Sequence, residues 1–263
     1  MQAQESVSPM VRQAPVTTAA TAKRTFTLMA VHAHPDDESF VSGTPMKLAA
    51  GGHTIGLLTL TRGDAGLWLG KAFGSWSPSE LAAERATEWA AAVGCVGFGW
   101  SRLLRYPDGG LKDAPADVIT ADIVQAIREV RPDVVCTFGP EGAGSEHDDH
   151  RSTSYFAARA FARAALADQY PERGDPHLAR RLFFSATPYV AEMPAAFGAT
   201  TPTHVIDVSE FERRKAEAFE CHKTQHKDRD FFYDLLKRRQ GKEYFHLAID
   251  RTGGAPRSDD LLG

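Results

Sequence analysis

Apolar runs alternate along this chain with stretches whose apolar residues have helical spacing. The apolar runs have the length of buried strands and fall at residues 26–32, 54–61, 133–138, 182–186, 203–208 and 243–249. Helical patterns fall at 38–50, 79–93, 116–131 and 150–167, and the charged segment 210–240 is typical of two more helices. This alternation predicts an α/β fold, a mostly parallel central sheet with helices on both faces.

The two ends of the chain lack this periodicity. Residues 1–24 are rich in Ala, Thr, Gln and Val and lack the apolar core of a signal peptide, so we expect a flexible tail. After Asp250 the composition turns to Gly, Pro, Ser and Asp, which predicts a loose tail over 251–263. A single catalytic domain over 25–250 is therefore the expected organisation.

Composition narrows the classes of protein that this chain can belong to. The net charge is −4 and no block of Lys or Arg occurs, so the electrostatic footprint of a nucleic-acid or anionic-membrane binder is missing. The sequence contains no run of about 18 apolar residues, so no membrane span is predicted. Three scattered cysteines favour buried thiols in a reducing compartment over a disulfide frame. We therefore expect a cytoplasmic protein.

Polar residues with metal-binding side chains follow two of the predicted strands. Residues 33–38 read Ala-His-Pro-Asp-Asp-Glu directly after the first apolar run, and residues 147–150 read His-Asp-Asp-His after the run that ends at Phe138. Because α/β sheets bind ligands beyond the carboxyl ends of their strands, the two loops can meet over one metal ion. Pro35 restricts the backbone between the first histidine and the carboxylates that follow it.

These motifs, with three weaker ones, resemble the PIG-L/LmbE family of zinc-dependent N-deacetylases over residues 25–250. The weaker motifs are Leu-Thr-Arg-Gly-Asp-Ala-Gly at 60–66, Tyr-Pro-Asp-Gly at 106–109 and a Lys-x6-His-Lys-Thr-Gln pattern at 215–225. The resemblance implies a Rossmann-like LmbE fold that hydrolyses an N-acyl, foremost an N-acetyl, group on an amino sugar or its conjugate. The chain departs from the family at Asp148, where proline is usual, and at 145–146, where an aromatic-glycine pair is frequent.

Two imidazoles and one carboxylate form the expected metal site. A hydrolytic zinc site needs about three protein ligands, which are supplied here by His34, Asp37 and His150. Iron(II) is the alternative metal. Non-haem iron oxygenases use the same ligand types, but Asp36 favours hydrolysis because a free carboxylate beside the metal can deprotonate a bound water. A turn of solvated acidic residues is the alternative to a metal site.

His147 is the second expected catalytic residue. By resemblance it polarises the scissile carbonyl and helps the amine to leave, a role that requires a cationic or well-oriented imidazole. The acidic residues Glu146 and Asp149 are near in sequence and favour the cationic form. His147 and His150 are three residues apart, so both can face one way if a helix begins there. An exposed helix start is the alternative.

Five further residues are assigned by resemblance. Arg62, at the exit of the second strand, is expected to bind substrate, with a structural ion pair as the alternative. Asp108 is expected to accept hydrogen bonds from sugar hydroxyls, although a Pro-Asp-Gly turn needs no ligand. Arg85, Lys215 and His222 are expected to support the site from behind, with surface or buried structural roles as alternatives.

The expected substrate is a small amino-sugar-type molecule. The apolar segment 67–76 reads as a lid over it or as a contact between subunits of an oligomer. Phosphoester hydrolysis is a rival reaction, although it usually requires more carboxylates or a second metal. A binding module with a vestigial metal site is a rival without catalysis, and the intact Asp36 argues against it.

Overall fold

A seven-stranded, mostly parallel sheet lies at the centre of the part of the chain that the computed structural model describes, residues 27–66, 76–145, 147–188, 200–254 and 257–262. In the order β3-β2-β1-β4-β5-β7-β6, the first five strands run parallel and β7 runs antiparallel to both of its neighbours. The strands are β1 (Thr27–His32), β2 (Thr54–Thr61), β3 (Trp100–Tyr106), β4 (Val134–Phe138), β5 (Arg181–Ser185), β6 (His204–Asp207) and β7 (Lys242–Asp250).

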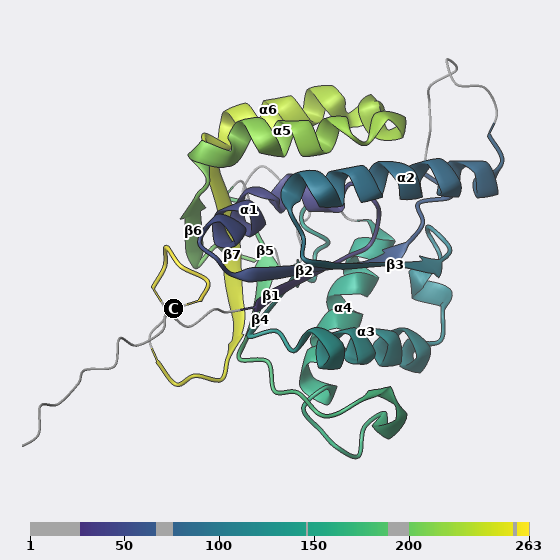
Figure 1. The fold of residues 1–263 in the computed structure, drawn as a ribbon, viewed down its shortest axis with the longest axis vertical. Helices are drawn as coiled ribbons and strands as arrows, with labels where there is room; N and C mark the ends of the chain where they lie inside the picture. The colour runs from purple at the N-terminus through teal and green to yellow at the C-terminus, as the bar shows by residue number, and fades with distance from the viewer. Residues whose placement is uncertain (1–26, 67–75, 146, 189–199, 255–256, 263) are drawn as a thin grey trace, which may run out of the picture.

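Helices cover both faces of this sheet, which confirms the predicted α/β fold (Figure 1). In that view α3 and α4 lie on one side of the sheet, and α1 and α2 lie on the other, with α5 and α6 stacked outside them. The bounds are α1 (Gly43–Ala50), α2 (Pro78–Val96), α3 (Ala116–Val130), α4 (Asp148–Arg163), α5 (Glu212–Glu220) and α6 (Arg229–Arg239). Short 3-10 helices η1 (Asp37–Val41), η3 (Leu111–Asp113), η4 (Pro171–Arg173), η6 (Ser209–Phe211) and η7 (Lys223–Asp228) connect them.

Alternate residues of the central strands build two separate cores. Met29 and Val31 of β1 pack into the cluster that includes the α3 isoleucines, whereas Leu28 and Ala30 face the clusters on the other side. This follows from the two-residue period of a strand, because successive side chains point to opposite faces. Both faces of β1 are therefore apolar, and the strand reads as an uninterrupted hydrophobic run.

The predicted strands and helices differ from the structure in several places, among them α4, which spans Asp148–Arg163 where 150–167 was expected. The edge strand β3 is absent from the prediction, because its side chains are mostly half-buried and its polar residues mask the strand pattern. Helix α2, expected over 79–93, begins at Pro78 behind a Ser77–Glu80 capping box and continues past Gly94 to Val96. The single helix expected over 38–50 is divided into η1 and α1.

The far end of the chain is anchored to the core. Leu261 and Leu262 are buried in the cluster beside β1 and β6, and the Val205 amide donates to the Ser258 carbonyl at 2.8 Å. The sequence predicted a loose tail after Asp250; burial of two leucine side chains instead ties this segment to the sheet. The expected tail over 1–24 and nearly all of the segment 67–76 lie outside the described residues. None of the helices described here has both the length and the apolar character that a membrane crossing requires.

Candidate metal centre

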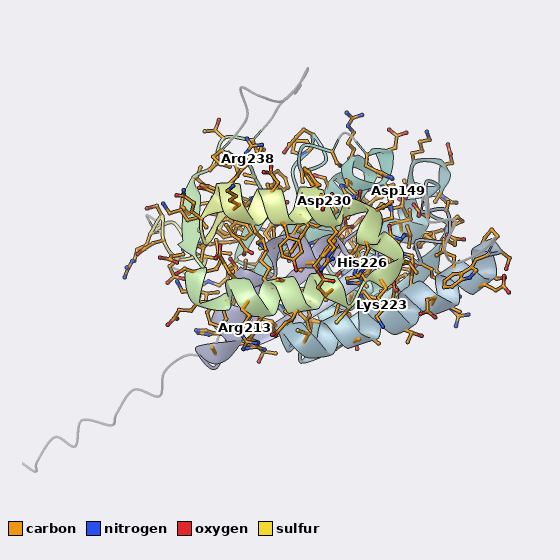
Figure 2. The ribbon with its side chains drawn as sticks, turned by 90° about the horizontal axis from the view of Figure 1, so that it is seen from above. Asp149, Arg213, Lys223, His226, Asp230 and Arg238 are labelled. Carbon is orange, nitrogen blue, oxygen red and sulfur yellow. The ribbon has the colours of Figure 1, made fainter. Side chains whose placement is uncertain are left out.

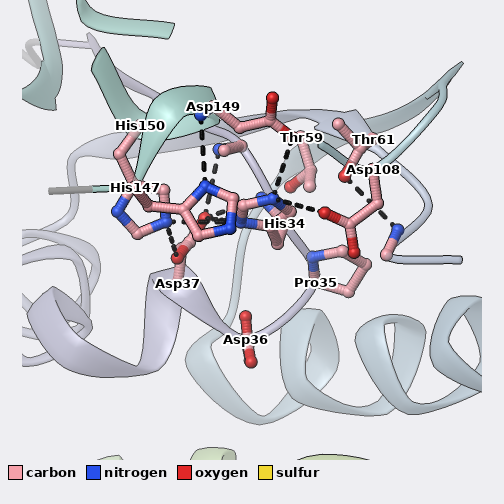
Figure 3. Close-up of polar contacts among 12 residues, drawn as sticks. His34, Pro35, Asp36, Asp37, Thr59, Thr61, Asp108, His147, Asp149 and His150 are labelled. Atoms are coloured by element: carbon pink, nitrogen blue, oxygen red, sulfur yellow. Dashed lines mark hydrogen bonds and ion pairs between the residues drawn. The ribbon is translucent and has the colours of Figure 1, made fainter. Parts of the chain in front are cut away.

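The two histidine-aspartate motifs meet at the carboxyl ends of β1 and β4, as the sequence predicted. These strands are parallel neighbours, so the loop after β1 and the loop before α4 leave the same edge of the sheet. His34 lies two residues beyond β1, and His150 lies in the first turn of α4. Figure 3 shows the side chains of both motifs converging in front of the sheet.

Three side chains present ligand atoms to one another at metal-site spacing. His34 Nδ1 lies 3.3 Å from His150 Nε2 and 3.5 Å from Oδ2 of Asp37. Oδ1 of Asp37 lies 3.1 Å from His150 Nε2. Two atoms that each bind a tetrahedral zinc ion at about 2.0–2.1 Å are roughly 3.3 Å apart, so the spacing and the donor types fit zinc.

The far nitrogen of each imidazole is held by the protein. His150 Nδ1 lies 3.2 Å from the Gly142 carbonyl and 2.9 Å from the Ser145 hydroxyl. His34 Nε2 lies 3.2 Å from Oδ2 of Asp149 and 3.0 Å from Oδ1 of Asp108. A proton on each far nitrogen leaves the inward nitrogen with a lone pair, which is how metal-binding histidines are oriented.

A second group of potential ligands, His34 with His147 and Asp149, is less suitable for a metal. The Asp149 carboxylate is fully buried and accepts hydrogen bonds from the amides of Gly109 at 2.6 Å and Leu111 at 3.0 Å. His147 Nδ1 accepts a hydrogen bond from the Asp149 amide at 3.1 Å. Because these lone pairs already have donors, Asp149 supports the site and does not compete for the metal.

Asp36 adopts a backbone conformation that only few residues with side chains adopt. Its φ is +124° and its ψ is −27°. Oδ2 of Asp36 lies 3.3 Å from Nη2 of Arg85, and Figure 3 shows the side chain set apart from the imidazoles. Burial raises the pKa of the Asp36 carboxyl to about 6, and the charge of Arg85 opposes that rise.

Arg85 is buried and contacts several residues around the first motif. Its guanidinium donates to the Pro35 carbonyl at 2.5 Å and to the Gly63 carbonyl at 3.0 Å, and it faces Asp36 and Asp108. Gly63 has a φ of +65°, and a Cβ at this position would overlap the guanidinium. The Thr-Arg-Gly-Asp sequence therefore needs its glycine so that Arg85 can approach.

His147 is the N-cap of α4, and its Nδ1 accepts the hydrogen bond from the Asp149 amide. Its ring lies edge-on to that of His34, with centroids 4.7 Å apart. Partial burial lowers the pKa of His147, two neighbouring imidazoles lower it further, and the nearby carboxylates oppose this less. The acidic neighbours do favour the cationic form of His147, as expected, but burial and the two imidazoles outweigh them. A neutral imidazole with a proton on Nε2 fits its hydrogen bond.

Two residues predicted to contact substrate differ in their surroundings. Arg62, at the end of β2, is half-buried and has no polar contact with any residue that the structure describes. The Asp108 side chain is only 7% exposed, and its two oxygens face His34 and Arg85. These contacts differ from the predicted role of Asp108 in binding sugar hydroxyls and favour one in orienting His34.

Lys215 and His222 are buried against η1 and, among the described residues, have no polar contact with the predicted metal ligands. Lys215 Nζ donates to Glu243 at 2.5 Å and to the Phe40 carbonyl at 2.8 Å, and Glu243 caps the first amides of α1. His222 Nε2 lies 2.5 Å from Oε1 of Glu38, and neither side chain is exposed. Lys215 therefore anchors the junction between η1 and α1, while His222 pairs with the last residue of the first motif.

Two buried carboxylates beside the site were not given a supporting role from the sequence. Asp149 was noted only as an acidic neighbour, and Glu38 only as a carboxylate after the ligands, yet both are buried and hydrogen-bonded beside the site. Their signal was present, because consecutive acidic residues next to an apolar strand cannot all face solvent. Only the fold shows which of them point inward.

The sequence is similar to a known protein family and to deacetylases from other organisms. Residues 29–161 match the PIG-L family, described as GlcNAc-PI de-N-acetylase. A 1D-myo-inositol 2-acetamido-2-deoxy-alpha-D-glucopyranoside deacetylase of Thermobifida fusca (strain YX) is 35% identical over 240 residues, which cover 75% of this chain and 82% of that protein. A protein of the same name from Rhodococcus jostii (strain RHA1) is 32% identical over 239 residues, with 75% and 81% covered.

The fold is shared with a solved structure of a related kind. The N,N'-diacetylchitobiose deacetylase from Pyrococcus horikoshii matches with a TM-score of 0.71 and 20% identity, over 88% of this chain and 89% of that chain. At this identity the likeness shows the fold alone. The family match shows more, because residues 29–161 include both histidine-aspartate motifs. The chain therefore belongs to the PIG-L family.

Proposed function

We propose that this protein is a zinc-dependent hydrolase that removes an N-acetyl group from an amino sugar or its conjugate, with iron(II) as the alternative metal. The observation that carries the proposal is the convergence of His34 Nδ1, Asp37 and His150 Nε2. A bound zinc ion supplies a Lewis acid that lowers the pKa of water and polarises the acyl carbonyl. His34, Asp37 and His150 would hold the ion, and such a set of two imidazoles and one carboxylate would suit a hydrolytic zinc site.

Asp36 and His147 are the proposed catalytic residues. Asp36 follows the first ligand by two residues, and its raised pKa suits a group that takes a proton near neutral pH. His147 is at the start of α4 beside both ligand imidazoles, with its Nε2 not used by the helix cap. We assign it to donate a hydrogen bond to the acyl oxygen as negative charge develops there. No covalent acyl-enzyme is required.

The acetamido-sugar substrate is proposed from the relatives. Two curated relatives at 32% and 35% identity are named as deacetylases of an acetamido glucopyranoside linked to inositol. Arg62, at the same sheet edge and without a polar partner among the described residues, is the proposed donor to sugar or inositol oxygens. The surroundings of Asp108 support orientation of His34 as its role.

Acetate release tests the reaction directly. The zinc-loaded protein is incubated with N-acetylglucosamine, N,N'-diacetylchitobiose and an inositol glycoside of N-acetylglucosamine, before and after chelation. We expect acetate from at least one glycoside and its loss on chelation. Asp37→Ala should lose both metal and activity, whereas Asp148→Asn should keep both, because Asp148 is half-exposed and pairs with Lys112 at the surface. Phosphate release from a phosphoester panel without acetate release would support the rival reaction.

Asp36→Asn separates the proposed base from the ligands. The amide cannot accept the proton, while His34, Asp37 and His150 are unchanged. Turnover should fall about 100-fold or more at unchanged zinc content, the usual scale for loss of a general base. Near-normal turnover at full zinc occupancy would show that another group is the base.

A further inference from the structure

The peptide unit between Pro35 and Asp36 is held by side chains at both ends. Its carbonyl oxygen accepts a hydrogen bond from Arg85 at 2.5 Å, and its N–H donates to Oε2 of Glu38 at 3.1 Å. Asp36, at the end of this unit, has the unfavourable φ of +124°. Such a conformation persists only where surrounding contacts hold it in place. Here the side chains of Arg85 and Glu38 hold it from different elements.

The second oxygen of Glu38 is held by His222. Oε1 of Glu38 lies 2.5 Å from His222 Nε2, and both side chains are completely buried. A rotation that released the Asp36 amide would also leave a buried imidazole without its partner. Glu38 is therefore fixed in the orientation in which it holds the peptide.

His222 comes from a part of the chain that is anchored independently. It precedes η7, which joins α5 to α6 at one end of the helix pair seen in Figure 2. The next residue but one, Thr224, is bound to Glu88 of α2 through its amide at 2.9 Å and its hydroxyl at 2.6 Å. The outer helices thus supply His222 from a rigid position.

We propose that Glu38, held by His222, is a positioning residue that locks the Pro35–Asp36 peptide and thereby aims the Asp36 carboxylate at the reacting water. Among the described residues, neither side chain has a polar contact with the facing ligand atoms of His34, Asp37 and His150. Without this acceptor the peptide can rotate, Asp36 can relax to a negative φ, and its side chain changes direction. The inference rests on the proposed role of Asp36 as the base.

A double replacement tests this role without leaving a buried charge. Glu38→Met with His222→Phe removes both polar partners and replaces them with apolar groups of similar size, which costs little stability. We expect a folded, fully zinc-loaded protein whose kcat is lower by roughly 10-fold to 100-fold, with KM changed by about 3-fold or less. Glu38→Gln should lose only about 5-fold, because its carbonyl oxygen can still accept the Asp36 amide proton.

The control is Arg213→Ala, on an 82% exposed side chain of α5, which leaves both the Glu38–His222 pair and the Thr224–Glu88 anchor in place. Its kcat should match that of the wild type. In the Asp36→Asn background the double replacement should cause no further loss, since both act on one group. A crystal structure of the double variant should show Asp36 without its positive φ.

Two results would overturn the proposal: wild-type kcat in the folded double variant, or a retained positive φ of Asp36 in its crystal structure. The second measurement does not depend on activity. If the wild-type protein released no acetate from any substrate, the proposed function would fail, while the crystal structure would still decide whether Glu38 and His222 lock the peptide.

Discussion

Replacement of Asp149 by asparagine should weaken zinc binding, although Asp149 is not a ligand. The Asp149 carboxylate accepts three N–H groups: the Gly109 amide at 2.6 Å, the Leu111 amide at 3.0 Å and His34 Nε2 at 3.2 Å. It thereby keeps the proton of His34 on Nε2 and the lone pair of Nδ1 toward the metal. The asparagine side chain would have almost the same shape but only one oxygen.

The magnitude follows from these three contacts. With its oxygen toward Gly109 and His34, the new amide would turn its NH2 group toward the Leu111 N–H, so one buried donor loses its acceptor. The hydrogen bond from His34 would also change from charge-assisted to neutral, a weakening of about 1–2 kcal/mol. We therefore expect the Kd for zinc to rise roughly 10-fold to 100-fold, the usual range for partners behind metal-binding histidines.

A competition titration with a chromophoric chelator measures this effect. Asp148→Asn is the matched control, since it makes the same chemical change one residue away, on a half-exposed side chain paired with Lys112. Its zinc affinity should match the wild type. Equal affinities of Asp149→Asn and wild type, with circular dichroism showing both folded, would refute the claim that Asp149 orients His34.

Three further predictions concern stability and turnover. Arg128→Ala should lower the free energy of unfolding in urea by about 3–5 kcal/mol, because the buried guanidinium donates to five backbone carbonyls of the segment after α4. The control is Arg213→Ala, on an 82% exposed side chain, which should not change the free energy of unfolding measurably. His147→Ala should lower kcat more than it raises KM, because it acts on charge that develops in the transition state, and a change in KM alone would make it a binding residue. Gly63→Ala should lower both the melting temperature and kcat, since the new methyl group displaces Arg85; unchanged values would show that Arg85 can shift freely.

The sequence alone determined the class of fold and the two motifs that meet at the candidate site. Apolar runs alternating with helical patterns are a local signal of a sheet that is buried on both faces, and the structure confirms this arrangement. The first motif follows β1 and the second precedes α4, so their meeting at one sheet edge followed from parallel pairing of the strands. The expectation that His34, Asp37 and His150 bind the metal drew on residue type and on the family resemblance, and the structure brings these three side chains together.

The tertiary structure decided how each polar side chain in these motifs is used. Asp36, Asp37 and Glu38 are consecutive carboxylates with the same local signal, yet they contact Arg85, His150 and His222, respectively. Likewise β3 depends on pairing with β2, and the leucines near the chain end depend on a distant apolar cluster. The physical reason is the same in each case, because hydrogen bonds and burial are formed with residues far away in the sequence, and only the folded chain brings those residues together.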